Sequence, residues 1–222
     1  MYSEKGTRPD ITYATHAAAR FCSDPRISHE MAITHITRYL QDTRDEGIII
    51  DPDAEKTLEV YADADFVGNY NKSTAQFDPS TAKSRSGYVI TFCGCPIVWI
   101  SKLQSCVALT SCESKYYAFS QALREAIPIM DLLEEIRSFC LTKDYVPTKV
   151  YCKAFEDNSG ASEMATLHKI RPRTEHINNI YHHFREHVRS GRIIVHAIST
   201  KEQFADIFTK PLDASTFLCL RK

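Results

Sequence analysis

The sequence predicts an α/β domain built on a mixed five-stranded sheet with helices on both faces. Three short segments rich in β-branched and aromatic residues follow one another between residues 58 and 103. Downstream, segments of helical period alternate with two further apolar strand segments. The chain has 222 residues, 43% of them hydrophobic, so it is long enough to bury one sizeable core. Consecutive strands followed by this alternation favour a mixed sheet covered by helices.

The first 46 residues precede the predicted sheet and carry helical patterns. Apolar residues recur at helical spacing in DITYATHAAARF and, after the breaker SDPRIS, in HEMAITHITRYLQD, which predicts two short helices. The charged, proline-bearing stretch DPDAEK at 51–56 then marks a boundary. We therefore expect a helical segment over 1–50 and the main domain over 56–222.

The three consecutive strands are LEVYADAD, SGYVITFC and PIVWISKL, and we expect them to pair antiparallel. A long polar loop, NYNKSTAQFDPSTAKSRS, separates the first two. Its cations Lys72, Lys83 and Arg85 outnumber Asp78, which suits either a flap facing phosphates or a solvated loop.

Helices and strands alternate after residue 110. KYYAFSQALREAI has a helical period, and Pro128 is expected to begin a second helix, because proline is tolerated in a first turn. The remaining elements are the strand TKVYCKAFED, a capped helix at NSGASEMA, a helix around TEHINNIYHHFREHVRS that stops at Gly191, the strand RIIVHAIS, and a final helix KEQFADIF.

The overall charge points to no particular partner, but one stretch is strongly basic. Lys and Arg number 27 against 28 Asp and Glu, a formal net charge of −1. Residues 167–192, however, hold six Lys or Arg against two Glu. This pattern suits a surface that tracks a nucleic-acid backbone, or a solvated helix face. Its candidate cations are Lys169, Arg171, Arg173, Arg185 and Arg189.

The eight cysteines show no CxxC spacing and mostly lie in apolar runs, which is typical of reduced core thiols in an intracellular, cytoplasmic or nuclear protein. The opening MYSEKGTRPD lacks the apolar stretch of a secretory signal, and no run approaches the roughly 20 apolar residues that span a bilayer. We expect a soluble protein with no membrane partner.

Acidic residues end or follow three of the predicted elements: Asp63 and Asp65, then Glu156 and Asp157, then Asp206. Such carboxylates repel one another unless cations lie between them, and two Mg²⁺ ions about 4 Å apart would support attack of water on a phosphodiester. Acids at strand ends also serve as turn formers or helix caps, and spacing alone leaves both readings open.

Several motifs together carry a family resemblance. YADADFVG, AKSRSGYVI, WISKLQ, TSCESKYYAFSQA, EDNSGA, RTEHINNIYHHFRE and ADIFTKPL resemble, in order and spacing, the ribonuclease H domain of copia-type retrotransposon polyproteins. GTRPDITYATHAAARF and RYLQDTRDEGIII are similar to the segment that joins it to the reverse transcriptase. No YxDD motif is present, so we expect no polymerase activity.

The resemblance implies a ribonuclease H-like fold that cleaves the RNA strand of an RNA–DNA hybrid with two divalent ions, Mg²⁺ or Mn²⁺, on four carboxylates. Asp63, Asp157 and Asp206 match three of them. Asp65, on the same strand face as Asp63, would assist or compete. The implied partners are hybrid or other nucleic acid and the reverse transcriptase portion of a larger polyprotein.

The fourth carboxylate is replaced in this chain. Where relatives read TEAEY, the second glutamate falls at Lys115 and the first at Glu113. Residues two apart on a helix lie roughly 200° around the axis, so Glu113 substitutes poorly if position 115 faces the site. We expect one metal site to be lost and hydrolysis to fall by on the order of 10²–10⁴, with binding retained. The alternative is a catalytically inactive nucleic-acid-binding or scaffold protein.

A competing motif lies at residues 183–187. HFREH matches the H-x-x-E-H pattern of inverted zinc metalloproteases, in which His183 and His187 bind zinc and Glu186 acts as the base. The pattern is short and its helix is basic, so we favour the nuclease interpretation.

Overall fold

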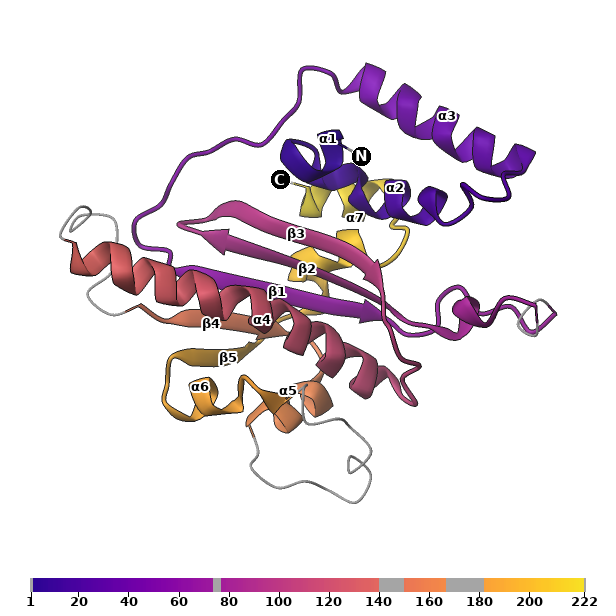
Figure 1. The fold of residues 1–222 in the computed structure, drawn as a ribbon. Coiled ribbons are helices and arrows are strands. Elements are labelled where there is room, and N and C mark those ends of the chain that lie inside the picture. The colour runs from indigo at the N-terminus through magenta and orange to yellow at the C-terminus, as the bar shows by residue number, and fades with distance from the viewer. Residues whose placement is uncertain (1, 74–76, 140–149, 167–181, 222) are drawn as a thin grey trace.

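A five-stranded mixed sheet forms the centre of the protein, as the sequence predicts (Figure 1). The computed structural model describes residues 2–73, 77–139, 150–166 and 182–221. The strands are β1 (Leu58–Asp65), β2 (Arg85–Phe92), β3 (Cys95–Leu103), β4 (Cys152–Glu156) and β5 (Ile193–Ala197), in the order β3-β2-β1-β4-β5. β1 pairs antiparallel with β2 and parallel with β4, and β5 runs parallel to β4. This confirms the expected antiparallel strands followed by helix and strand alternation.

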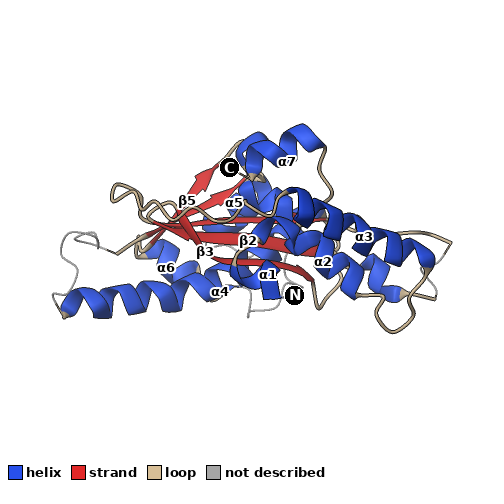
Figure 2. Cartoon of the chain, turned by 90° about the horizontal axis from the view of Figure 1, so that it is seen from above, coloured by secondary structure: helices blue, strands red, loops and turns tan. Residues whose placement is uncertain are grey.

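A long helix, α4 (Ser111–Ser138), covers one face of the sheet (Figures 1 and 2). The Thr110 side chain caps it by accepting a hydrogen bond from the Glu113 N–H. The prediction that Pro128 begins a separate helix is wrong, because α4 runs through it. Pro128 is exposed, while Ala126 and Met130 on either side are fully buried against the sheet, so packing outweighs the local cost of proline.

The opposite face of the sheet packs against the C-terminal segment. Tyr61 and Val89 form a second apolar cluster with η6, a 3₁₀ helix (Phe204–Phe208). The predicted single helix over 201–208 is therefore wrong: η5 (Thr200–Glu202) and η6 are separate 3₁₀ turns, followed by an unpredicted helix, α7 (Ala214–Leu220).

Gln203 explains why the α-helix does not form there. Its backbone is extended, and its fully buried side chain donates from Nε2 to the Ala62 carbonyl at 3.1 Å while accepting from the Ala205 N–H. This tertiary bond to β1 replaces the intrahelical bonds that residue periodicity alone predicts.

Two short helices follow β4. α5 (Ser159–Thr166) is present as predicted. The predicted helix over 174–190 is tested only from residue 182, where α6 (Arg185–Arg189) follows the fully buried Phe184. Gly191, with φ of +73°, ends this segment as expected, because only glycine adopts that conformation at little cost.

The N-terminal residues form α1 (Tyr2–Gly6), η1 (Pro9–Ile11), α2 (Thr12–Ala19) and α3 (Ile27–Asp42). The two helices expected over 10–46 are confirmed, and residues 46–57 are irregular. α1 is tied to the edge strand β3, because the Trp99 Nε1–H donates to the Glu4 carbonyl at 2.6 Å. Figure 1 shows these helices beyond the β3 edge of the sheet.

The polar loop between β1 and β2 contains one short 3₁₀ helix, η2 (Pro79–Ala82), capped by Asp78. Arg20 from the end of α2 donates to Ser80 Oγ at 2.7 Å, which connects this loop to the N-terminal segment.

The described cysteines all carry free thiols, as their spacing predicts. None of the helices within the described ranges is long and apolar enough to cross a membrane.

Candidate active site

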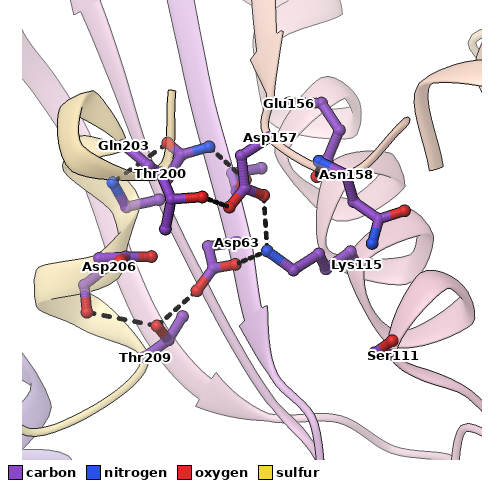
Figure 3. Close-up of polar contacts among 12 residues, drawn as sticks. Asp63, Ser111, Lys115, Glu156, Asp157, Asn158, Thr200, Gln203, Asp206 and Thr209 are labelled. Carbon is purple, nitrogen blue, oxygen red and sulfur yellow. Dashed lines mark hydrogen bonds and ion pairs between the residues drawn. The ribbon is translucent and has the colours of Figure 1, made fainter. Parts of the chain in front are cut away.

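Three aspartates from distant parts of the chain meet beyond the carboxyl ends of β1 and β4 (Figure 3). Parallel pairing of these strands brings Asp63, near the end of β1, close to Asp157, the residue after β4. Asp206 comes from η6 on the opposite face of the sheet. Asp63 is 1% exposed and Asp206 4%, so both carboxylates are almost fully removed from water.

Lys115, in the second turn of α4, reaches into this group of carboxylates. Its Nζ lies 2.6 Å from Asp63 Oδ1 and 2.5 Å from Asp157 Oδ1, and it donates a hydrogen bond to each. Burial alone would lower the pKa of Lys115, but the charge and hydrogen bonds of Asp63 and Asp157 outweigh it and raise the pKa. The amine is therefore a permanent cation at neutral pH.

The same contact acts on the partner carboxylate. Burial alone would raise the pKa of Asp63, but Lys115 outweighs burial and lowers it below its ordinary value of 3.8. The pair is thus a charge-assisted, nearly dry interaction, of the kind that is stronger than a neutral hydrogen bond.

The cluster contains three polar residues that the sequence analysis did not single out. Thr209 Oγ1 donates to Asp63 Oδ2 at 2.7 Å, and Thr200 Oγ1 donates to Asp157 Oδ2 at 3.0 Å. Lys210 Nζ lies 2.8 Å from Asp206 Oδ2 and 3.8 Å from Asp63 Oδ2. The sequence could have indicated two of them. Thr209 and Lys210 follow Asp206 by three and four positions in ADIFTKPL, which is the spacing of neighbours on one helical face.

Asp206 has a different protonation behaviour from Asp63. Its burial, and next the negative charge of Asp63, raise the pKa of Asp206 to about 7. Its Oδ1 is buried without a hydrogen-bond partner among the described residues.

Two further acids adjoin the three aspartates. Asp65 is half-buried against Gly68, where an added Cβ would lie 1.7 Å from its Oδ2, and burial followed by the charge of Asp63 raises its pKa. Glu156 is 1% exposed, accepts from the Asn158 N–H at 3.1 Å, and has a pKa raised well above its ordinary range by burial. Burial therefore disfavours the charged form of Glu156.

Glu113, the candidate substitute ligand, lies elsewhere. Its carboxylate accepts a hydrogen bond from the Leu109 N–H at 2.8 Å and another from the Tyr117 hydroxyl. The hypothesis that Glu113 replaces the missing glutamate is therefore wrong, because the helix register directs Lys115 to the aspartates and ties Glu113 to the start of its own helix.

The residues of this cluster do not fit two divalent ions. Within the described part of the chain, no group of three or more His, Cys, Asp and Glu side chains is arranged to hold a metal ion. The ammonium group of Lys115 is bonded to two of the carboxylates that a metal would need, and the ammonium of Lys210 to the third. Two fixed positive charges thus compete with any cation that enters.

The H-x-x-E-H motif does not form the helical zinc site that its sequence suggests. α6 begins only at Arg185, so His183 lies outside the helix that carries His187. His187 Nδ1 lies 3.3 Å from Arg192 Nη1, a cationic neighbour that disfavours a metal. The zinc hypothesis is therefore wrong for this geometry.

The predicted nucleic-acid-binding cations differ in how far their side chains are exposed to solvent. Arg85 is wrongly assigned: it is 2% exposed, donates to Ser101 Oγ at 3.1 Å, and lies over the Tyr13 ring, because it begins a strand that is covered on both faces. Arg185 is half-buried and donates to the Met164 carbonyl. Lys72 and Arg189 are exposed and Lys83 is half-exposed, whereas Lys169, Arg171 and Arg173 lie outside the described residues.

Gly87 of β2 allows the C-terminal segment to approach the sheet. A Cβ at this position would lie 2.6 Å from Thr209 Cγ2 and 2.7 Å from Phe208 Cβ. We expect Gly87→Ala to lower the free energy of unfolding by about 1–3 kcal/mol, because η6 must move outward and take Thr209 from Asp63. Urea denaturation measures the change. Gly47→Ala, with nothing within 4 Å, is the matched control, and equal effects in both variants would contradict the proposed close packing.

Comparisons with known proteins identify relatives over almost the whole chain. It is 36% identical over 220 residues to the retrovirus-related Pol polyprotein from transposon TNT 1-94 of Nicotiana tabacum, covering 99% of this chain and 15% of the relative. It is 34% identical over 211 residues to the corresponding polyprotein from transposon RE1 of Arabidopsis thaliana, covering 95% of this chain and 13% of the relative. The chain thus spans less than a sixth of these curated relatives. No protein-family model matches it.

A solved structure is similar at low identity. The N-terminal RNase H domain of rv2228c from Mycobacterium tuberculosis matches with a TM-score of 0.45 and 10% identity, covering 74% of this chain and 96% of that one. This likeness is too weak to carry a conclusion about activity.

The strand order, the strand directions and the acidic end of β1 and β4 define the class: a ribonuclease H-like α/β domain. The sequence relatives then define the family. The chain belongs to the retrovirus-related Pol polyproteins of copia-type transposons.

Proposed function

We propose that this chain is the ribonuclease H-like portion of a Pol polyprotein, that it binds RNA–DNA hybrid, and that it hydrolyses the RNA strand slowly or not at all. The observation that carries the proposal is the position of Lys115, whose Nζ lies 2.6 Å from Asp63 and 2.5 Å from Asp157. In the related enzymes a glutamate is expected there. Residues 1–50 are then the end of the polymerase portion that precedes the domain.

The impairment has an electrostatic reason. Divalent ions in such a reaction would activate water and stabilise the charge that develops on phosphate, and all the oxygen ligands must be available to hold them. Here Lys115 contributes a positive charge where a carboxylate ligand is needed, and it occupies lone pairs of Asp63 and Asp157. We infer that Mg²⁺ and Mn²⁺ bind weakly, and that the carboxylates serve the fold more than the chemistry.

Retention of hybrid binding is supported by cations that are accessible at the surface. Lys72 and Arg189 are exposed and Lys83 is half-exposed, so their charges are available to phosphate groups. Contacts with phosphate depend on charge and not on the metal-binding carboxylates, so binding should weaken as salt rises.

A cleavage assay tests the proposal. A labelled RNA–DNA hybrid is incubated with the parent, Lys115→Glu and Lys115→Glu/Asp63→Asn, in magnesium and in manganese. We expect slow or no cutting by the parent, faster cutting by Lys115→Glu by on the order of 10²-fold or more, and loss of that gain in the double variant. A parent that cuts as fast as Lys115→Glu, and stops when Asp63 alone is changed to Asn, is an unimpaired enzyme and contradicts the proposal.

The alternative of a non-enzymatic binding or scaffold protein makes a different prediction for the same assay. Neither the parent nor Lys115→Glu then cuts, although both bind hybrid. Arg189→Glu should weaken that binding, while Arg26→Glu, an exposed residue before α3, should leave it unchanged.

A further inference from the structure

We propose that Lys115 is a tethered cation that takes over charge neutralisation in the acidic cluster, so that nucleic acid binds there without a divalent metal. The inference rests on the proposed hybrid binding and goes beyond it, because it predicts how that binding and the stability of the site respond to metal ions. It also assigns Lys115 a role in binding, whereas loss of hydrolysis alone requires only that a glutamate is missing.

The geometry places the ammonium where a shared cation is needed. Asp63 and Asp157 come from neighbouring parallel strands, and Lys115 Nζ lies within 2.6 Å of an oxygen from each. The lysine side chain is 15% exposed, and the two carboxylates are 1% and 5% exposed. Two nearly dry carboxylates that approach one cation so closely require its charge, since their mutual repulsion is poorly screened.

The ammonium also retains a contact for a ligand. A lysine amine has three N–H donors. Asp63 and Asp157 accept two of these within the described residues. The third N–H, on a side chain that still reaches solvent, is available to a phosphate oxygen, which lysine binds as a point charge. Thr200 and Thr209 hold the outer oxygens of the same carboxylates, so the arrangement is already formed before a ligand arrives.

The charge difference from a glutamate is large. Exchange of Lys115 for glutamate lowers the formal charge of the cluster by two, next to aspartates that face the expected path of the phosphates. A cluster with a glutamate at position 115 repels the nucleic-acid backbone until divalent cations neutralise the carboxylates. Lys115 already neutralises part of their charge without a metal ion. The chain should therefore bind hybrid equally well with and without magnesium, and the glutamate variant should not.

Binding measurements test this directly. Fluorescence anisotropy of a labelled RNA–DNA hybrid is recorded at constant ionic strength, in EDTA and in magnesium. The parent should show the same Kd in both within about twofold, and Lys115→Glu should bind on the order of tenfold more weakly in EDTA than in magnesium. Lys56→Glu is the matched control: it makes the same charge change at an exposed residue beside the opposite end of β1, and should show no metal dependence.

Thermal unfolding without nucleic acid gives a second readout that needs neither binding nor activity. Magnesium or manganese should leave the Tm of the parent unchanged and raise the Tm of Lys115→Glu, since a ligand stabilises only the state that binds it. A parent that gains as much Tm from magnesium as Lys115→Glu, or binds hybrid only with magnesium, overturns the inference and leaves the proposed hybrid binding intact. Hybrid binding by neither protein in any buffer overturns the proposed function, and the melting curves then decide the role of Lys115.

Discussion

Lys115→Met is expected to lower the free energy of unfolding by about 3–5 kcal/mol, the cost of removing one partner from a buried ion pair. Methionine has a similar length and no charge, so the carboxylates of Asp63 and Asp157 are left close together and nearly dry. A loss of packing accounts for little of this, because the volume at position 115 hardly changes. Urea denaturation at neutral pH, followed by circular dichroism, measures the loss.

Acid should reduce the difference in the free energy of unfolding between the parent and Lys115→Met. Lys115 lowers the pKa of Asp63 below the 3.8 of an unfolded chain, so the stabilisation is complete above that value and is lost as the pH falls through the lower, folded pKa. Arg124→Met, at an exposed position of the same helix, is the control and should change stability by less than about 0.5 kcal/mol. A Lys115→Met variant as stable as this control would show that the ion pair contributes nothing.

The second large effect is expected where the N-terminal segment is held to the rest of the protein. Arg8 donates to Asp10 Oδ1 at 3.0 Å and to Oδ2 at 2.8 Å, and it also donates to the Thr43 carbonyl at the end of α3. Tyr39 of α3 donates to Asp10 Oδ2 at 2.6 Å, and Arg221, after α7, donates to the Tyr39 hydroxyl at 2.8 Å. The side chains of Arg8 and Asp10 are 8% and 7% exposed. This network therefore joins η1, α3 and the C-terminus.

Asp10→Asn should weaken this attachment by about 3 kcal/mol, because the Arg8 guanidinium loses its counter-charge in a nearly dry site. Burial alone would raise the pKa of Asp10, but Arg8 and then Tyr39 outweigh it and lower the pKa below 3.8. The stabilisation is therefore present above that value and is lost as the pH falls through the folded pKa, and the asparagine variant should lack this acid sensitivity.

Amide hydrogen exchange locates the effect of Asp10→Asn. Exchange should accelerate in α2 and α3 more than in β1, since the change loosens the N-terminal segment and leaves the sheet intact. Asp24→Asn is the control, because Asp24 and Arg26 form an exposed pair 3.9 Å apart, which contributes little. Equal acceleration in the helices and the sheet would mean that the segment unfolds together with the domain.

Local patterns in the sequence predicted most of the fold. β1 begins and ends where the segment LEVYADAD predicts, and β2 and β3 agree to within one residue. These predictions succeed because a short run of β-branched and aromatic residues bounded by turn residues is a property of neighbouring residues. The errors at Pro128 and Gln203 have the opposite origin, since contacts with the sheet outweigh a local preference in both cases.

The residues of the candidate site were likewise predicted from the sequence only in part. The resemblance indicated Asp63, Asp157 and Asp206, and the helical period placed Lys115 on their side of α4 and Glu113 on the other. The sequence did not reveal that Arg85 is buried. Arg85 lies where a polar loop meets a strand, and the local sequence is the same whether its side chain faces solvent or the core.

The sequence by itself determined most of the elements, the family and the presence of a lysine where relatives are expected to have a glutamate, because these follow from residue type and short-range patterns. Only the tertiary structure decided what that lysine contacts. Its partners Asp63 and Asp157 are 52 and 42 positions away. Contact over such distances depends on how α4 packs across β1 and β4, and this is set by the whole core.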